Sequence, residues 1–416
     1  MTRMKESGID WIGQIPEEWD ISKIKFTTQL NGRIGWQGLT SAEYKEEGPY
    51  LITGTDFHNG TINFETAVHI DEKRWSEASQ IQVENGDLLI TKDGTVGKVA
   101  IISGLDDKAS LNSGVLRIQT IDEIDRRFLY YVLLSDEFWM WFNYTNSGAS
   151  TILHLYQNVF DEFTFTFPQK NEQQKIADFL DKKTAQLDKV KVLLEEQIQK
   201  LKDYRASLIY ETVTKGLDKT VPMKDSGIDW IGQVPEGWGV ERLKYLVEIS
   251  TGTSNTQDRT VESEGYPFFV RSQNVEKLPT YTHDTEAILT AGDGVGVGKV
   301  FHYYKGKFTA HQRVYILSNF KNIESKFLFY YVSINLKNEV SLGGAKSTVD
   351  SIRMPMLSNF MVSIPSSTEQ HNISNYLDCE IKRIQAMIEI KQNQIENIDK
   401  QRQTLIYDYV TGKRRV

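Results

Sequence analysis

The sequence contains two sets of polar side chains whose types suit hydrogen bonding to DNA bases. They occur in stretches that contain glycine and resemble loops. Arginine and lysine match the hydrogen-bond acceptors of guanine in the major groove of DNA, and asparagine and glutamine match adenine. We therefore interpret these side chains as candidates for reading base edges, although each one taken singly is more often a solvated surface residue. The candidates are Arg33, Gln37, Asn59, Lys92, Asn112 and Ser113 in the first set, and Asn255, Gln257, Arg271, Gln273, Asn274, Gln312, Arg313 and Lys346 in the second.

Two glycine-rich segments have the composition of phosphate-binding loops but not the spacing. In Gly292–Lys299, GDGVGVGK, Asp293 stands where the first glycine of such a loop must be, and Val300 stands where serine or threonine is required. The segment Thr91–Lys98, TKDGTVGK, fails in the same way. We predict that both segments are turns between two strands of a hairpin.

Other catalytic and metal-binding motifs are also missing from the sequence. The seven histidines show neither H-x-H nor H-E-x-x-H spacing, so no metal site is predicted. There is no G-x-S-x-G nucleophile elbow, and no Asn/Asp-Pro-Pro-Tyr/Phe motif of the kind found in amino-methyltransferases. Carboxylates are abundant, but their spacing singles out no catalytic pair. We expect no catalytic residue in this chain.

Composition limits the class of protein. A length of 416 residues predicts two or three domains, and a hydrophobic content of 39% is enough for folded cores. Cys379 is the only cysteine, which excludes disulfides within the chain and fits a reducing compartment. The sequence has neither the apolar core of a signal peptide nor a run of about 18 apolar residues that could span a membrane. We expect a cytoplasmic protein. Its net charge of −8 comes mostly from residues 1–167, so a nucleic-acid surface there would need a local basic patch or a basic partner.

The elements that must position these loops are revealed by an internal repeat. Two stretches of about fifty residues, 168–217 and 365–416, align with each other without a gap, so that Glu172-Gln173 matches Glu369-Gln370. Neither contains proline or glycine between its first residues and Gly216 or Gly412, where a helix would end. Each stretch is predicted to be one long helix.

Apolar residues recur every seven positions along both predicted helices, which is the pattern of a coiled coil. We predict a second seam row at Ile176, Val190 and Tyr204. Two matched seams in one chain favour pairing of the two helices with each other over two unrelated surface helices or dimerisation through one of them. The first seam row is predicted at Leu180, Leu187, Leu194, Leu201 and Leu208, and at Leu377, Ile384, Ile398 and Leu405, with Lys391 interrupting the second set.

A second repeat precedes each of the two variable regions. Residues 4–19, MKESGIDWIGQIPEEW, return almost unchanged as residues 223–238, and we expect Trp11 and Trp19 to pack against the domain that follows. Each region then has a strand leading into a turn, two strands joined by a glycine-containing turn, a helical stretch, and a last strand. The predicted domain boundaries are 1–167 for the first domain with its lead-in, 168–217 for the first long helix, 218–364 for the second domain with its lead-in, and 365–416 for the second long helix.

These motifs together resemble the DNA-specificity (S) subunit of Type I restriction–modification systems. The resemblance covers the whole chain and is carried by GIDWIGQIPEEW and its repeat, by GDLLITKDGTVGK, and by P-x-x-x-E-Q-x-x-I-x-x-(F/Y)-L-D at the head of each long helix. It implies an α+β fold with a pseudo-twofold internal repeat. Two mixed α/β target-recognition domains would be separated by two long helices that form an antiparallel coiled coil.

The resemblance also implies a function. Such a chain reads a bipartite, asymmetric DNA target and directs other subunits to it, without catalysing a reaction itself. Its expected partners are double-stranded DNA, two methyltransferase (M) subunits and two restriction/translocase (R) subunits, and no membrane. S-adenosylmethionine, ATP and Mg would belong to those partners, so no cofactor is expected here. Two alternatives remain: a single-chain DNA-modifying enzyme, against which the missing motifs count, and a coiled-coil scaffold that binds no DNA.

Overall fold

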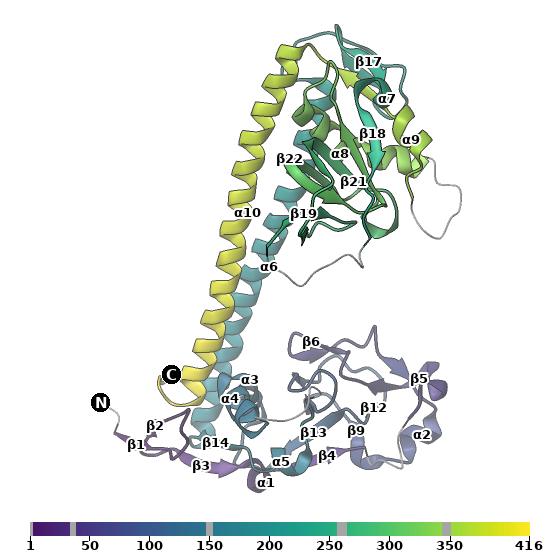
Figure 1. Ribbon diagram of the computed structural model, residues 1–416. Coiled ribbons are helices and arrows are strands. Elements are labelled where there is room, and N and C mark those ends of the chain that lie inside the picture. The colour runs from purple at the N-terminus through teal and green to yellow at the C-terminus, as the bar shows by residue number, and fades with distance from the viewer. Residues whose placement is uncertain (1–2, 34–38, 147–152, 256–263, 343–350) are drawn as a thin grey trace. The chain divides into compact units, whose positions relative to one another are not determined.

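The computed structural model describes residues 3–33, 39–146, 153–255, 264–342 and 351–416 (Figure 1). The chain divides into two compact units, and each unit combines one domain with part of both long helices. Unit 1 comprises Met1–Leu193 and Asn393–Val416, and unit 2 comprises Leu194–Gln392. The fold predicted from the repeats is confirmed in outline.

The two long helices form as expected. Helix α6 spans Lys170–Lys215 and helix α10 spans Ser367–Val410. Each is followed by a glycine with a left-handed backbone, Gly216 at a φ of 72° and Gly412 at 70°, which is a common way for a helix to end. A side chain would not fit at Gly412 in any case, because a Cβ atom there would lie 2.5 Å from the ring of Pro16.

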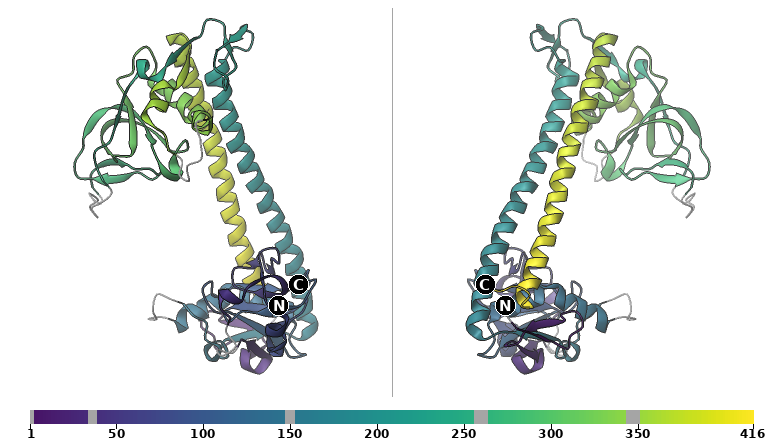
Figure 2. Two further views of the ribbon diagram at one scale, coloured as in Figure 1. Left: turned by 90° about the vertical axis from the view of Figure 1, so that its right-hand side faces the viewer. Right: turned by 90° about the vertical axis from the view of Figure 1, so that its left-hand side faces the viewer.

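Within each unit, α6 and α10 lie side by side and run antiparallel (Figures 1 and 2). Residue numbers rise along α6 as those of their partners fall along α10. In unit 1, Asp188 pairs with Arg402 at 3.4 Å and Lys191 with Asp399 at 2.9 Å. In unit 2, Lys391 donates a hydrogen bond to Gln197 and Arg205 donates one to Gln385.

The structure corrects one part of the predicted seam. Val190 and Tyr204 are 45% and 53% exposed, so the second row does not follow them. It lies instead four residues after each of the first four positions of the first row, at Thr184, Lys191, Ile198 and Arg205 in α6 and at Ile381, Ile388, Ile395 and Arg402 in α10. Lysine or arginine holds three of these positions, because a long side chain can be half-buried there and still reach a partner on the other helix. The first row itself is buried at Leu180, Leu377 and Ile384 and half-buried at Leu187, Leu194, Leu201, Leu208, Ile398 and Leu405.

The described residues of unit 1 form two four-stranded sheets. The orders are β11-β10-β13-β4 and β8-β5-β12-β9, in which β5 and β12 are parallel. Two hairpins, a strand pair and short helices complete the domain. The strands are β1 Met4–Glu6, β2 Gln14–Pro16, β3 Asp20–Lys23, β4 Thr28–Gly32, β5 Lys45–Ile52, β6 Phe57–His58, β7 Thr61–Ile62, β8 Val68–His69, β9 Gln82–Val83, β10 Leu88–Thr91, β11 Val99–Ile101, β12 Ala109–Leu111, β13 Val115–Thr120 and β14 Thr164–Phe167, and the helices are α1 Ile24–Thr27, α2 Glu72–Ser76, α3 Arg126–Leu134, α4 Asp136–Thr145 and α5 Gln157–Phe160.

Where unit 1 has two sheets, the described residues of unit 2 form a six-stranded sheet in the order β18-β23-β21-β22-β19-β20. Its β19 and β22 are parallel, as β5 and β12 are in unit 1. The strands are β15 Met223–Asp225, β16 Gln233–Pro235, β17 Gly239–Arg242, β18 Glu248–Thr251, β19 Tyr266–Phe269, β20 Glu276–Leu278, β21 His283–Ala291, β22 Phe301–Ala310, β23 Val314–Ser318 and β24 Met361–Ile364, and the helices are α7 Leu243–Leu246, α8 Ser325–Leu342 and α9 Met354–Asn359.

Both sequence motifs at the heads of the long helices attach a domain to its helix. Gln173 of α6 accepts a hydrogen bond from the backbone N–H of Asp125 at 2.8 Å, and Asp181 accepts one from the hydroxyl of Tyr131 at 2.7 Å. The repeat preserves both contacts in unit 2, where Gln370 accepts from the N–H of Glu324 and Asp378 from the hydroxyl of Tyr330. The glutamine of E-Q and the aspartate of L-D are therefore explained by domain docking. The tryptophans predicted to pack also do so: Trp19 is fully buried and Trp11 packs against the same core.

The core of unit 1 contains an unpaired carboxyl group. The helical stretch predicted in the first variable region breaks at Ser135, whose extended backbone separates α3 from α4. Glu137, in the first turn of α4, is fully buried, and neither of its oxygens has a hydrogen-bond partner among the described residues. Burial raises the pKa of Glu137 well above its usual range, because the charged form would lose its hydration.

Replacing Glu137 with glutamine is expected to reduce the dependence of stability on pH. The folded protein keeps the proton of Glu137 at pH values where the unfolded chain, with a pKa of about 4.3, has lost it. Stability is therefore lost as pH rises above that value, by up to about 1.4 kcal/mol per pH unit. Glu137→Gln should gain stability relative to the parent from pH 5 to pH 7, measured by urea unfolding. If the difference in unfolding free energy between Glu137→Gln and the parent were constant from pH 5 to pH 7, the raised pKa of Glu137 would be contradicted. Glu17→Gln, a change at an exposed position, is the control.

Candidate nucleic-acid interface

In each unit, loops that are distant in sequence meet at one place beyond the ends of the central strands. In unit 1 this loop cluster consists of residues 53–56, 92–98, 112–114 and 153–155. The β10–β11 turn is pinned by backbone bonds, because the N–H of Lys92 donates to the carbonyl of Gly114 at 2.8 Å and the N–H of Leu155 donates to that of Lys92 at 2.9 Å. The carboxylate of Asp93 in the same turn contacts Nδ1 of His154.

Unit 2 has the same loop cluster, made of residues 270–274, 292–300, 311–313 and 351–352. The N–H of Gly292 donates to the carbonyl of Arg313 at 2.9 Å, and the N–H of Ile352 donates to that of Gly292 at 2.9 Å. Asp293 takes the place of Asp93 and binds Arg271 and Arg313. The two glycine-rich segments are thus hairpin connections, as predicted: β10 pairs with β11 and β21 with β22, both antiparallel.

In the loop cluster of unit 2, two arginines lower the pKa of Asp293 and the pKa of His311. Burial would raise the pKa of the Asp293 carboxyl, but hydrogen bonds from Arg271 and Arg313 outweigh it and hold that pKa below its usual value. The pKa of His311 is lowered by burial and by the same two arginines, and its Nδ1 accepts a hydrogen bond from the N–H of Arg313 at 3.1 Å. A hollow of about 310 Å³ beside these groups is lined in part by Asp293, His311 and Val295.

Most of the described base-reading candidates belong to these clusters or border them. Asn255 is exposed and follows Ser254, which bridges to His311. Asn59 lies elsewhere, in the two-residue turn between β6 and β7, where its positive φ of 49° suits a hairpin. Gln37, Gln257 and Lys346 lie outside the described residues. The candidates within the clusters are Lys92, Asn112 and Ser113 in unit 1, and Arg271, Gln273, Asn274, Gln312 and Arg313 in unit 2.

Arg33 is a correction to the predicted set. It is 5% exposed, and its guanidinium donates to the carbonyl of Leu111 at 2.8 Å and to the hydroxyl of Ser110 at 3.0 Å. It therefore joins the end of β4 to β12 and is not available to a base. The sequence analysis also did not identify Asp93, Asp293 and His154 as members of the loop clusters. The two aspartates could have been found from the matching tripeptides K-D-G and G-D-G, which stand at equivalent places in the two variable regions.

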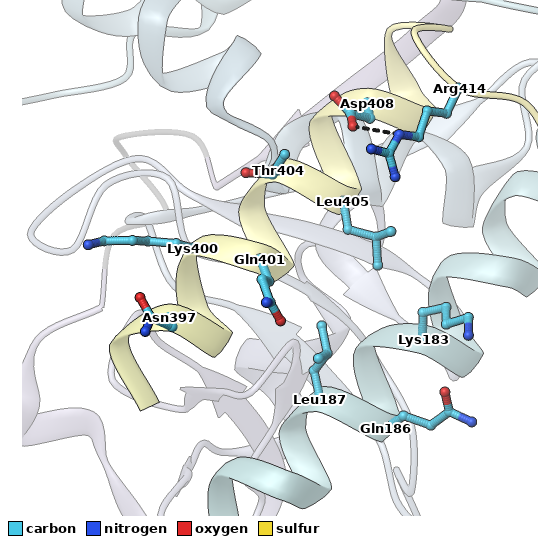
Figure 3. Close-up of a pocket in the computed structure, with 10 residues that line it drawn as sticks. All are labelled: Lys183, Gln186, Leu187, Asn397, Lys400, Gln401, Thr404, Leu405, Asp408 and Arg414. Carbon is cyan, nitrogen blue, oxygen red and sulfur yellow. Dashed lines mark ion pairs between the residues drawn. The ribbon is translucent and has the colours of Figure 1, made fainter. Parts of the chain in front are cut away.

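A separate hollow of about 660 Å³ lies between α6 and α10 in unit 1 (Figure 3). Leu187 and Leu405 face each other across it, and an ion pair between Asp408 and Arg414 closes one end. Its other lining residues are polar: Lys183, Gln186, Asn397, Lys400, Gln401 and Thr404. No base-reading candidate lines it, so it is a feature of the helix pair and not of the loop clusters.

The described part of the chain contains neither a membrane-spanning helix nor a cluster of metal ligands. None of the helices there is both long enough and apolar enough to cross a membrane. Within the same residues, no group of three or more histidine, cysteine, aspartate or glutamate side chains is placed to hold a metal ion.

Comparison with known proteins identifies relatives along the whole chain. A family model for the type I restriction modification DNA specificity domain matches residues 16–201 and 235–398. The putative type I restriction enzyme MjaX specificity subunit of Methanocaldococcus jannaschii is 25% identical, over 97% of this chain and 96% of its own length. In a study of complex assembly and conformational transition of the type I R-M system, one solved chain matches at a TM-score of 0.73 and 16% identity, covering 96% of this chain and 99% of that one. The HsdS subunit from Thermoanaerobacter tengcongensis matches at 0.52 and 15%, covering 96% and 98%.

Proposed function

We infer that this chain, which belongs to the family of type I restriction–modification DNA specificity domains, is the subunit that confers DNA target specificity on such a system. The observation that carries this inference is the duplicated loop cluster. The family match falls once on each unit, and each unit presents one cluster with its own set of polar side chains. Two such readers in one chain suit a bipartite target, and their different side chains suit an asymmetric one.

Catalysis is assigned to partner subunits in this proposal. The sequence lacks the motifs of an amino-methyltransferase and of an ATP-binding loop. Methyltransferase subunits would bring S-adenosylmethionine, and restriction subunits would bring ATP and Mg. Two copies of each fit the internal repeat, because two units built alike offer two equivalent surfaces. The assembly would act on DNA in the cytoplasm.

The purified chain alone is expected to transfer no methyl group to DNA and to bind DNA weakly. Unit 1 carries the strongly acidic residues 1–167, so most contacts to phosphate would come from a partner. With its methyltransferase partner, the chain should direct labelled methyl groups to a defined sequence, and binding should fall steeply with added salt because phosphate contacts release counterions.

The control for this experiment is the methyltransferase partner without the chain, which should methylate no defined sequence. Methyl transfer by the chain alone would favour a single-chain modifying enzyme. Failure of the complex to bind DNA would favour a coiled-coil scaffold. The two alternatives are therefore distinguished by two measurements: methyl transfer by the chain alone, and DNA binding by the complex.

A further inference from the structure

Two arginines in the loop cluster of unit 2 are held by a single carboxylate. Arg271 follows β19 and Arg313 precedes β23, and the Nη1 atoms of both donate to Asp293: Arg271 to Oδ1 at 2.8 Å, and Arg313 to Oδ2. The arginine side chains are 44% and 58% exposed, whereas that of Asp293 is 21% exposed. The carboxylate thus lies beneath two guanidinium groups that face solvent.

The backbone around this triad is tightly constrained. Arg313 donates its N–H to the ring of the buried His311 and accepts from the N–H of Gly292. A Cβ atom at Gly296 would lie 2.4 Å from the carbonyl oxygen of Arg271, so this position requires glycine for the hairpin to approach β19. The glycine-rich segment that resembled a phosphate loop therefore positions an arginine.

Unit 1 has glycine at both arginine positions. Parallel pairing places Ile52 opposite Leu111 in unit 1 and Phe269 opposite Ala310 in unit 2, so Ile52 and Phe269 are equivalent. Gly54 lies two residues after Ile52, and Arg271 lies two residues after Phe269, so these two positions correspond. Gly114 corresponds to Arg313, because each accepts the same backbone hydrogen bond from the start of the glycine-rich turn. The equivalent carboxylate, Asp93, pairs with His154 instead.

The geometry of the triad suits a base edge better than a phosphate. Each guanidinium has five N–H donors, and the bonds to Asp293 use one from each, which leaves donors to bind the O6 and N7 acceptors of guanine. The carboxylate lowers the local charge and would repel a nearby phosphate, but it restricts the rotamers of both arginines before DNA binds. Asp293 is also less exposed than either arginine, so the guanidinium groups present more surface to a bound base than the carboxylate does.

We propose that Arg271 and Arg313, oriented by Asp293, read guanine in the major groove of the half-site bound by unit 2, and that unit 1 has no equivalent reader. This assignment rests on the proposed function in DNA target recognition. Asp293 acts as a positioning residue, and the two arginines are the groups that contact the base. The two half-sites should accordingly differ in their dependence on guanine.

The test uses the full chain in complex with its methyltransferase and the target sequence obtained by methylome mapping. Each guanine of the target is replaced in turn by 7-deazaguanine, which lacks the N7 acceptor, and by inosine, which keeps O6 and N7 but lacks the minor-groove amino group. At one or two guanines of one half-site, 7-deazaguanine should weaken binding by about 5- to 150-fold, whereas inosine should have little effect.

Variants then assign this dependence to the triad. Arg271→Gln and Arg313→Gln should each abolish the penalty for 7-deazaguanine at one position. Asp293→Asn should reduce that penalty without weakening binding to unrelated DNA. A variant that only damaged the fold of the domain would weaken binding to unrelated DNA as well. Arg242→Gln is the matched control, because Arg242 is exposed at the start of α7, beyond the opposite end of β18.

Sequence-selective binding that is insensitive to 7-deazaguanine, or that keeps the same sensitivity in both arginine variants, would overturn this inference and leave the proposed function intact. Absence of any sequence-selective binding by the parent complex would overturn both.

Discussion

Replacing residues 239–364 with the corresponding domain of a related specificity subunit should change one half of the recognised DNA sequence and leave the other half unchanged. The physical reason is where the exchanged segment begins and ends. β17 pairs with β24, so Gly239 lies directly opposite Ile364 and both splice points are adjacent in the structure. The loop cluster of unit 2 lies wholly between them, and both long helices lie outside.

The effect on specificity should be large, because specific DNA binding typically exceeds non-specific binding by about 10³- to 10⁷-fold. The replacement must keep a hydroxyl group to donate to Asp378 and a backbone N–H to donate to Gln370, since these contacts dock the domain on α10. Methylome mapping of the exchanged chain, expressed with its methyltransferase, measures the new target.

The matched control is the exchange of residues 20–167, whose ends are joined in the same way because Asp20 pairs with Phe167. It should change the other half of the target. If either exchange altered both halves together, the two units would not be independent readers.

The second large effect is expected from a charge placed in the helix seam. Ile384 of α10 is 1% exposed, although the next three residues on the helix are exposed. Ile384→Asp should lower the free energy of unfolding of unit 2 by several kcal/mol, because it removes a buried apolar side chain and leaves an unpaired carboxylate in its place. Urea unfolding followed by far-ultraviolet circular dichroism measures this loss.

Ile390→Asp provides the comparison on the same helix with the same chemical change. Ile390 is 58% exposed, so this variant should change stability by no more than about 0.5 kcal/mol. Equal losses in the two variants would mean that burial in the seam does not determine the stability of this region.

Much of the architecture is a local property of the sequence. The absence of proline and glycine over long stretches, and the glycines at 216 and 412, determine where α6 and α10 begin and end, because helix length depends on neighbouring backbone groups. The repeated lead-in and the repeated E-Q and L-D motifs show that two units are built alike, and the glutamine and aspartate of these motifs make the same contacts in both units. The hairpin connections at 91–98 and 292–299 also follow from local turn chemistry.

The sequence alone did not determine which partner each polar side chain meets. Apolar periodicity predicted the first seam row, but Thr184, Lys191 and Arg205 in the second row look like surface residues until the opposite helix is present. Arg33 looked like a loop arginine and proved to be a buried link between β4 and β12. Its burial depends on β12, which lies far along the chain.

The candidate site is likewise a product of tertiary structure. Arg271, Asp293 and Arg313 are separated by about twenty residues each and come together only because β19 pairs with β22, and β21 with β23. The equivalence of these arginines to Gly54 and Gly114 is visible only in strand register, since the sequences around them differ. Sequence therefore determined the helices, the repeat and the fold class, which rest on contacts within a few residues, whereas the packing of distant strands decided which side chains share a loop cluster.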